Sequence, residues 1–190
     1  MPALPKLFRA PATEDVATVS RRLDQFAEKY KAFFPRVFAY VYGRVQNVHV
    51  TEDLVSEIFE RAFLKEHSLR NDEAFATWLF TIARNLLASH GRRRGRETIV
   101  DPEIFSAVAT GGPSIESQVL LREEVAAVAH CLKKFPQREQ DIIALKFDAE
   151  LTNGQIARIM GLSEANVRVI LFRTLRKLRE LMAARPGARD

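Results

Sequence analysis

Apolar side chains recur every three or four positions along most of the chain, which is the spacing of one face of an α-helix. In the first half they form three stripes, over residues 26–45, 54–63 and 75–86. Segments that alternate apolar and polar residues, as a half-buried strand would, are nearly absent. The pattern predicts a compact helical domain over residues 21–96, preceded by a loose tail of residues 1–20.

The periodicity stops after this first domain. The Asp-Pro pair at 101–102 and the Gly-Gly-Pro run at 111–113 favour turns over helix. We interpret residues 97–118 as a flexible linker. Helical spacing resumes over residues 119–183, and residues 184–190 form a short C-terminal tail. The predicted fold class is therefore all-α, with two small helical domains joined by a flexible linker.

The second half contains the pattern of a helix-turn-helix. A short helix is expected near residues 155–160, followed by Gly161, which tolerates the positive φ of a tight turn. A long helix then begins at Ser163, and Thr152 and Ser163 are both side chains that cap helix N-termini. Ala157 is small where the two helices would cross. A generic helical hairpin is the alternative, but the agreement of small, turn and apolar positions favours a true helix-turn-helix.

The long helix also has the chemistry to read DNA. On a helical wheel Val167, Leu171, Thr174 and Leu178 face inward. A recognition helix places its outward residues against base edges in the major groove, where arginine can bond guanine through two hydrogen bonds. The residues that fall outward or on the flanks and suit this role are Arg168, Val169, Phe172, Arg173 and Arg176. For Lys177 and Arg179 the alternative, that a basic side chain only solvates the helix, is as strong as contact with DNA.

In the first half an acidic helix is followed by a basic one. Thr51 is expected to cap the acidic helix, whose acids are Glu52, Asp53, Glu57 and Glu60. The next helix is rich in aromatic residues and is followed by an arginine cluster, Arg84, Arg92, Arg93, Arg94 and Arg96. Aromatic residues beside arginines suit single-stranded nucleic acid. The alternatives are a solvated acidic surface, and core packing for Phe75 and Trp78.

Composition narrows the class of partner and the compartment. The net charge of +5 and the pI of about 9.6 favour a polyanionic partner, either nucleic acid or an acidic membrane surface. The only cysteine, Cys131, lies on an apolar helix face and is expected to be buried, which fits a reducing compartment. No signal peptide or membrane-spanning stretch is visible, so we expect a cytoplasmic protein without membrane insertion.

The sequence offers no catalytic constellation. The four histidines, His49, His67, His90 and His130, are scattered, and none has the spacing of a metal ligand. A glycine-rich phosphate loop and a Cys-His pair are also missing. We therefore expect no enzymatic activity, no cofactor and no metal.

The two constellations, in this order, resemble the extracytoplasmic-function group of bacterial RNA polymerase sigma factors. The segments that carry the resemblance are EDLVSEIFERAF (52–63), FATWLFTIARN (75–85), FPQREQDIIALKF (135–147) and LTNGQIARIMGLS (151–163). It covers residues 24–96 and 119–182. The main alternative is a one-component helix-turn-helix regulator that binds a palindrome as a dimer without docking on polymerase.

The resemblance implies a different role for each half of the chain. The first half would be sigma region two, which docks on the clamp helices of the largest polymerase subunit and reads and opens the −10 element. The second half would be region four, which binds the flap of the second-largest subunit and reads the −35 element. The function implied is to direct core RNA polymerase to specific promoters, and an anti-sigma protein is a further candidate partner.

Site residues follow from the same resemblance. The residues implied in polymerase docking are Asp53, Leu54, Glu57 and Glu60. Those implied at the −10 element are Ser68, Asn71, Asp72, Arg84, Asn85, Arg92 and Arg93. At the −35 element Ser163 and Asn166 join the five outward residues of the long helix.

The chain departs from the family pattern on or beside the reading helix. The family usually has glutamate where Gln155 stands, often preceded by an aromatic residue where this chain has Gly154. It often has Gly-Thr at 165–166, and polar or basic residues at positions that here are Val169, Ile170 and Leu175. These changes leave the fold in place but bear on the −35 preference. Val169 could contact either a thymine methyl group or a protein.

Overall fold

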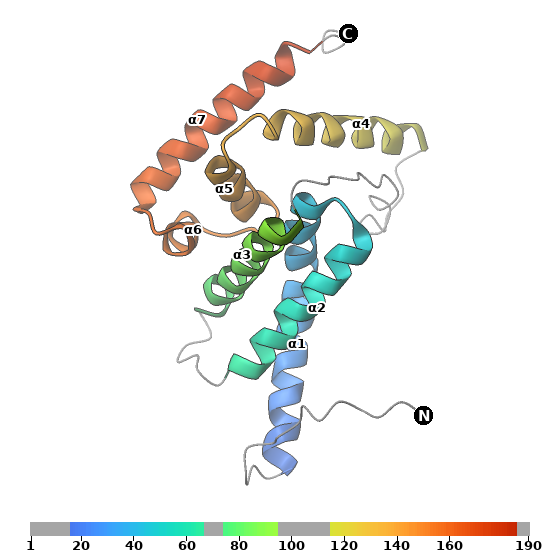
Figure 1. Ribbon diagram of the computed structural model, residues 1–190, viewed down its shortest axis with the longest axis vertical. Coiled ribbons are helices and arrows are strands. Elements are labelled where there is room, and N and C mark those ends of the chain that lie inside the picture. The colour runs from blue at the N-terminus through green and yellow to red at the C-terminus, as the bar shows by residue number, and fades with distance from the viewer. Residues whose placement is uncertain (1–15, 67–73, 95–114, 186–190) are drawn as a thin grey trace.

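The computed structural model describes residues 16–66, 74–94 and 115–185. The described residues form α-helices and no strand, which confirms the predicted all-α class (Figure 1). The helices are α1 (Val16–Val45), α2 (Val48–Lys65), α3 (Phe75–Arg94), α4 (Ile115–Leu132), α5 (Gln137–Phe147), α6 (Asn153–Met160) and α7 (Glu164–Ala183). Two predicted boundaries shift, because α1 already begins at Val16 and α4 at Ile115.

The first half is a three-helix unit in which α1 packs against both α2 and α3. Its core residues come from all three helices and include Val37, Ile58 and Leu79, each 0% exposed. The core-packing interpretation holds for Phe75, which is 2% exposed, and Trp78 packs partly buried against the same core.

The N-terminus of α2 differs from the prediction. Asn47 is the capping residue, and its side-chain Oδ1 accepts a hydrogen bond from the Val50 amide at 3.0 Å. Thr51 lies one turn inside the helix, where its buried hydroxyl donates to the Asn47 carbonyl at 2.7 Å. Threonine and asparagine both cap helices, and the apolar Val48 and Val50 extend the helix upstream of the predicted start.

The helix-turn-helix forms as predicted from α6 and α7. Thr152 and Gln155 make a reciprocal capping box: the Gln155 amide donates to Thr152 Oγ1 at 3.2 Å, and the Thr152 amide donates to Gln155 Oε1 at 2.9 Å. Gly161 ends α6 with a φ of 65°, the left-handed conformation that favours glycine. Gln155, one of the departures from the family pattern, thus serves as the second member of this capping box.

Three of the four residues predicted on the inward face of α7 are buried, and the fourth, Leu178, is partly buried. Val167, Leu171 and Thr174 are 0%, 7% and 2% exposed, and they pack toward α5 and α6. The Thr174 hydroxyl donates to Glu139 of α5 at 3.2 Å. Cys131, at the end of α4, is 2% exposed, as expected.

The two halves pack directly on each other. In Figure 1 the unit of α4 to α7 lies across one end of the α1–α3 unit. The contact is made by α6 against α3 and by α5 against α1. Buried side chains of the two halves form one continuous apolar core, in which Phe80 of the first half and Ile156 of the second are both 0% exposed.

Candidate nucleic-acid interface

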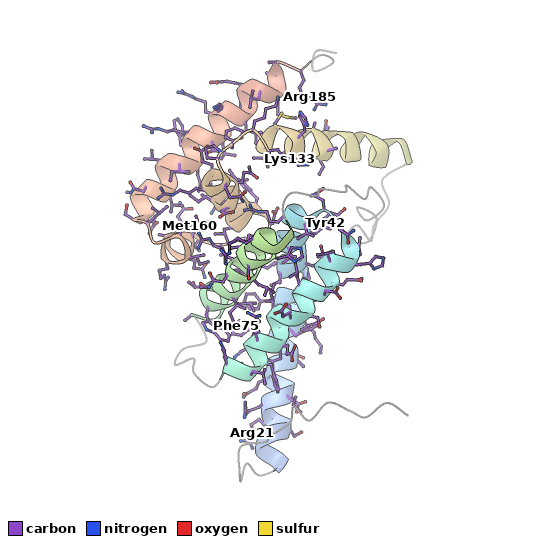
Figure 2. The ribbon with its side chains drawn as sticks, in the orientation of Figure 1. Arg21, Tyr42, Phe75, Lys133, Met160 and Arg185 are labelled. Atoms are coloured by element: carbon purple, nitrogen blue, oxygen red, sulfur yellow. The ribbon has the colours of Figure 1, made fainter. Side chains whose placement is uncertain are left out.

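The outer face of α7 carries the predicted base-reading residues on its exposed side. Val169 is 47% exposed and Phe172 is 68% exposed, an unusual position for such large apolar side chains. The exposed polar members of this face are Asn166, Arg168, Arg173 and Arg176. Figure 2 shows side chains of α7 projecting away from α5 and the rest of the molecule. The helix therefore presents apolar and cationic groups together on one open surface.

Two of these residues also have local partners. The Ser163 Oγ accepts a hydrogen bond from the Asn166 amide at 3.2 Å, so its side chain fixes the start of α7. The Arg176 Nε lies 3.6 Å from the Glu180 carboxylate, one turn away. Arg168 and Arg173 form no ion pair with the described part of the chain. Within the described residues, no carboxylate therefore offsets the charge of these two arginines.

The acidic face of α2 consists of Asp53, Glu57 and Glu60. Asp53 and Glu60 are exposed, and the Glu57 carboxylate accepts a hydrogen bond from Arg61. Leu54, placed in the same set by sequence, is only 6% exposed and lies in the core of the first half. Its side chain holds α2 in place beneath the acids and does not reach the surface.

The residues predicted for the −10 element are only partly described. Ser68, Asn71 and Asp72 lie outside the described residues. Asn85 and Arg92 are exposed on α3, and Arg93 follows in the last turn of the same helix. Arg84 lies on the same helix, but its side chain contacts the second half of the molecule.

Arg84 faces the other half of the molecule. Its Nε lies 3.7 Å from an Asp141 carboxylate oxygen of α5, and its side chain is 37% exposed. Arg44 of α1 lies against the other Asp141 oxygen at 2.6 Å. One carboxylate of the second half therefore lies between two arginines of the first.

Comparisons with known proteins show the family to which the chain belongs. Residues 30–97 match the family model of Sigma-70 region 2, and residues 131–180 match that of Sigma-70 region 4. The chain is 30% identical to the RNA polymerase sigma factor CnrH of Cupriavidus metallidurans over 70% of its own length and 73% of that protein. The chain is a sigma factor of the extracytoplasmic-function group. It directs RNA polymerase to promoters and, like its family, has no catalytic activity.

Two further relatives of this sigma factor are also sigma factors of the extracytoplasmic-function group. It is 29% identical to the sigma factor SigM of Bacillus subtilis over 81% of its length and 93% of that protein. It is 31% identical to the sigma factor BldN of Streptomyces coelicolor over 84% of its length, and spans 61% of that longer protein. The alternative of a one-component regulator is wrong, because both polymerase-associated regions are present in order.

Solved structures show the same fold. The sigma factor RpoE of Bartonella quintana, solved with the anti-sigma factor NepR, has a TM-score of 0.67 at 21% identity, over 86% of this chain and 99% of that one. CnrH, solved with the cytosolic domain of CnrY, has a TM-score of 0.66 at 20% identity, over 86% and 91%. None of the described helices of this sigma factor is long and apolar enough to cross a membrane.

The cluster around Asp141 was not foreseen from the sequence. Burial raises the pKa of Tyr40, on α1, to about 12, although Arg44 and Arg84 oppose the rise. Burial also raises the pKa of Asp148 to about 6, partly offset by Arg44. A signal was present, since Asp141 directly precedes the buried Ile142 in an amphipathic segment. What the sequence lacked was any indication of which helix would face it.

Replacing Asp148 with asparagine is expected to raise the free energy of unfolding at pH 8 by roughly 1–3 kcal/mol, with little change at pH 4. In the folded protein the pKa is about 6, against an ordinary value of 3.8. The proton is therefore bound more tightly when the chain is folded. This stabilisation is complete below pH 4 and is lost as the pH rises through 6, whereas asparagine remains neutral throughout.

Urea unfolding of Asp148→Asn between pH 4 and pH 8 measures this effect. The groups around the cluster, Tyr40, Arg44, Arg84 and Asp141, are left unchanged. Glu124→Gln removes an exposed acid of α4 and is the matched control. Parallel pH profiles for the two variants and the parent protein would contradict the prediction.

Proposed function

We propose that this sigma factor works through surfaces on both of its halves, which contact core polymerase and the two promoter elements. The observation that carries the proposal is the outer face of α7. It exposes Val169 and Phe172 together with arginines, on the second helix of a helix-turn-helix whose opposite face is buried. A recognition helix in the major groove has this arrangement.

The outer face of α7 is assigned to the −35 element. Arg168 and Arg173 are free to bond guanine edges, and Val169 offers an apolar contact to a thymine methyl group. Asn166 lies one turn from the N-terminus, where a recognition helix reaches bases. Ser163 belongs to this surface through the cap that it provides for α7.

The −10 element is assigned to α3 and the segment before it. Asn85, Arg92 and Arg93 lie along α3, with Arg84 beside them, and Ser68, Asn71 and Asp72 complete the set by family resemblance. Unpairing and flipping a base costs a few kcal/mol. Phosphate contacts from arginines offset part of this cost, and polymerase supplies the remainder. We therefore expect weak promoter binding by the free chain.

Core polymerase docking is assigned to the acidic face of α2, with the clamp helices of the largest subunit as partner. The flap of the second-largest subunit is the proposed partner of the second half, and the cytoplasm the proposed location. One protein of similar fold is solved with an anti-sigma factor, and another with the cytosolic domain of CnrY. A protein inhibitor of this kind is included among the proposed partners.

Reconstituted transcription with purified core polymerase and a promoter library tests the proposal. Promoter-specific initiation should require both components and should yield −10 and −35 motifs together. Glu60→Lys, on the acidic face, should weaken polymerase binding roughly tenfold or more, since close like charges cost several kcal/mol at an interface. Glu124→Lys makes the same charge change at an exposed acid of α4 and should have little effect. Operator binding by the protein alone, without polymerase dependence, would refute these assignments.

A further inference from the structure

One lysine of α1 contacts both the end of α2 and the start of α3. The Lys29 Nζ lies 2.6 Å from the Oε1 of Glu66, the residue that follows α2. The same ammonium lies 5.1 Å from the centroid of the Phe75 ring, and Phe75 is the first residue of α3. Three segments of the first half therefore meet at one charged group.

The ring of Phe75 is held on several sides. It is 2% exposed, and its centroid lies 5.2 Å from that of the Phe33 ring. Phe33 follows Lys29 by one turn of α1, so both side chains reach the Phe75 ring from the same face of that helix. The Trp78 ring of α3 lies beside it, with centroids 6.0 Å apart. The start of α3 is thus fixed against α1 by an aromatic ring and a cation together.

The ion pair of Lys29 differs from a neighbouring one on α1 in its burial and its span. The side chains of Lys29 and Glu66 are 24% and 16% exposed, and the two residues are 37 positions apart. Lys31 and Glu28 also form an ion pair, at 2.8 Å, but they lie within one turn of α1 and are 70% and 74% exposed. An exposed pair contributes little, because water and salt screen its charges. A shielded pair between two segments restricts their relative motion, because parting its charges leaves them poorly hydrated.

The two ends that Lys29 contacts border the proposed −10 surface. That surface consists of residues along α3 and of Ser68, Asn71 and Asp72, which lie between the two ends in the sequence and outside the described residues. Groups that are held in place before DNA arrives lose less conformational freedom on binding it. Holding the end of α2 and the start of α3 together therefore favours the −10 contacts without adding a contact to DNA.

We propose that Lys29 is a positioning residue for promoter opening, which binds Glu66 and the Phe75 ring and so fixes the end of α2 and the start of α3 in the arrangement that the −10 element requires. Lys29 acts through these partners and not by touching DNA itself. The functional part rests on the proposed −10 surface, whereas the contact of Lys29 with the two ends does not. Contact and role can be measured separately, the first without polymerase or DNA.

Variants of the full chain separate the ammonium from the rest of the lysine side chain. Lys29→Met keeps an unbranched apolar stem and removes the charge. Lys29→Arg keeps a cation that pairs with carboxylates and lies on aromatic rings. Glu66→Gln removes the ion pair and leaves the contact with Phe75. Lys31→Met makes the same chemical change two residues away, at the exposed ion pair, and is the matched control.

Hydrogen exchange of the free proteins provides the first measurement. Lys29→Met should speed exchange roughly tenfold at amides in the last turn of α2 and the second turn of α3, since an interaction of about 1.4 kcal/mol is a factor of ten. Lys31→Met should exchange like the parent. Unchanged exchange in Lys29→Met would overturn the contact. Equal acceleration in every helix, α7 included, would also count against it, because that result reports a loss of global stability.

Initiation by reconstituted holoenzyme provides the second measurement, on a duplex promoter and on the same promoter with its −10 region already unpaired. Lys29→Met should lower initiation on the duplex roughly tenfold, and the unpaired promoter should restore most of it, because the cost of unpairing has been removed. Lys29→Arg should stay within about twofold of the parent, since it keeps the cation. Lys29→Met combined with Glu66→Gln should be no worse than Lys29→Met alone, because Glu66 acts through Lys29.

The two promoters distinguish positioning from a merely structural role. Equal losses on duplex and unpaired DNA, or an equal loss in Lys31→Met, would overturn the positioning role, because a less stable protein initiates poorly on both templates. If the parent protein initiates without dependence on a −10 element, the proposed −10 surface fails. The exchange result then decides by itself whether Lys29 holds the two ends together.

Discussion

Promoter-specific initiation is expected to fall roughly 100-fold at promoters with a −35 element when Arg168 and Arg173 are both replaced by alanine. A good bidentate contact to guanine contributes about 1–3 kcal/mol, and each 1.4 kcal/mol is a factor of ten. Both arginines are exposed on α7 and form no ion pair with the described residues, so their removal should leave stability unchanged. Run-off transcription with reconstituted holoenzyme measures the loss.

The control for this pair is Arg138→Ala combined with Arg185→Ala. It removes the same charge from two exposed positions of the second half that lie off the outer face of α7. Initiation should then stay close to that of the parent protein. Equal losses in the two double variants would mean that net charge, and not the outer face of α7, determines promoter binding.

Phe80→Ala is expected to lower the free energy of unfolding by about 3–5 kcal/mol, the usual cost of truncating a buried aromatic side chain. Phe80 is 0% exposed, and its ring packs edge-on against Tyr40 with centroids 5.6 Å apart. The Arg36 guanidinium lies 5.9 Å from the centroid of the same ring. The substitution should therefore leave a cavity where the first half meets the second. Urea denaturation followed by circular dichroism measures the change.

Phe172→Ala makes the identical chemical change on the open side of α7. Because Phe172 is 68% exposed, the free energy of unfolding should change by less than about 0.5 kcal/mol. The same variant should weaken initiation at −35-dependent promoters, since Phe172 lies on the proposed reading face. A large loss of stability here would contradict the placement of Phe172 on the open face of α7, and a small one for Phe80→Ala would contradict its burial in the core.

Sequence alone predicted the features that depend on local interactions. The capping side chains at Thr152 and Ser163, the left-handed Gly161 and the inward face of α7 all depend on neighbours within a few residues, and all are confirmed. The start of α2 was misplaced because two capping residues compete within one turn, and the apolar residue at Val48 favours the earlier one, Asn47.

The same reasoning did not predict the contacts between residues far apart in the sequence. Arg84 was predicted to contact promoter DNA, and its ion-pair partner, Asp141, lies in the other half of the chain and was not foreseen. Helical periodicity shows which face of a helix is apolar and does not show which distant helix will cover it. The sequence likewise suggested Leu54 for docking by its place in a motif, while the fold directs that side chain inward.

The placement of α7 away from the contact between the two halves has a consequence for the order of events at a promoter. Its outer face is exposed while the halves are in contact, so α7 can meet duplex DNA before any rearrangement. Arg84, on the proposed −10 surface, lies instead against Asp141 of the second half. The early encounter should therefore be fast and sensitive to salt, as electrostatic association is.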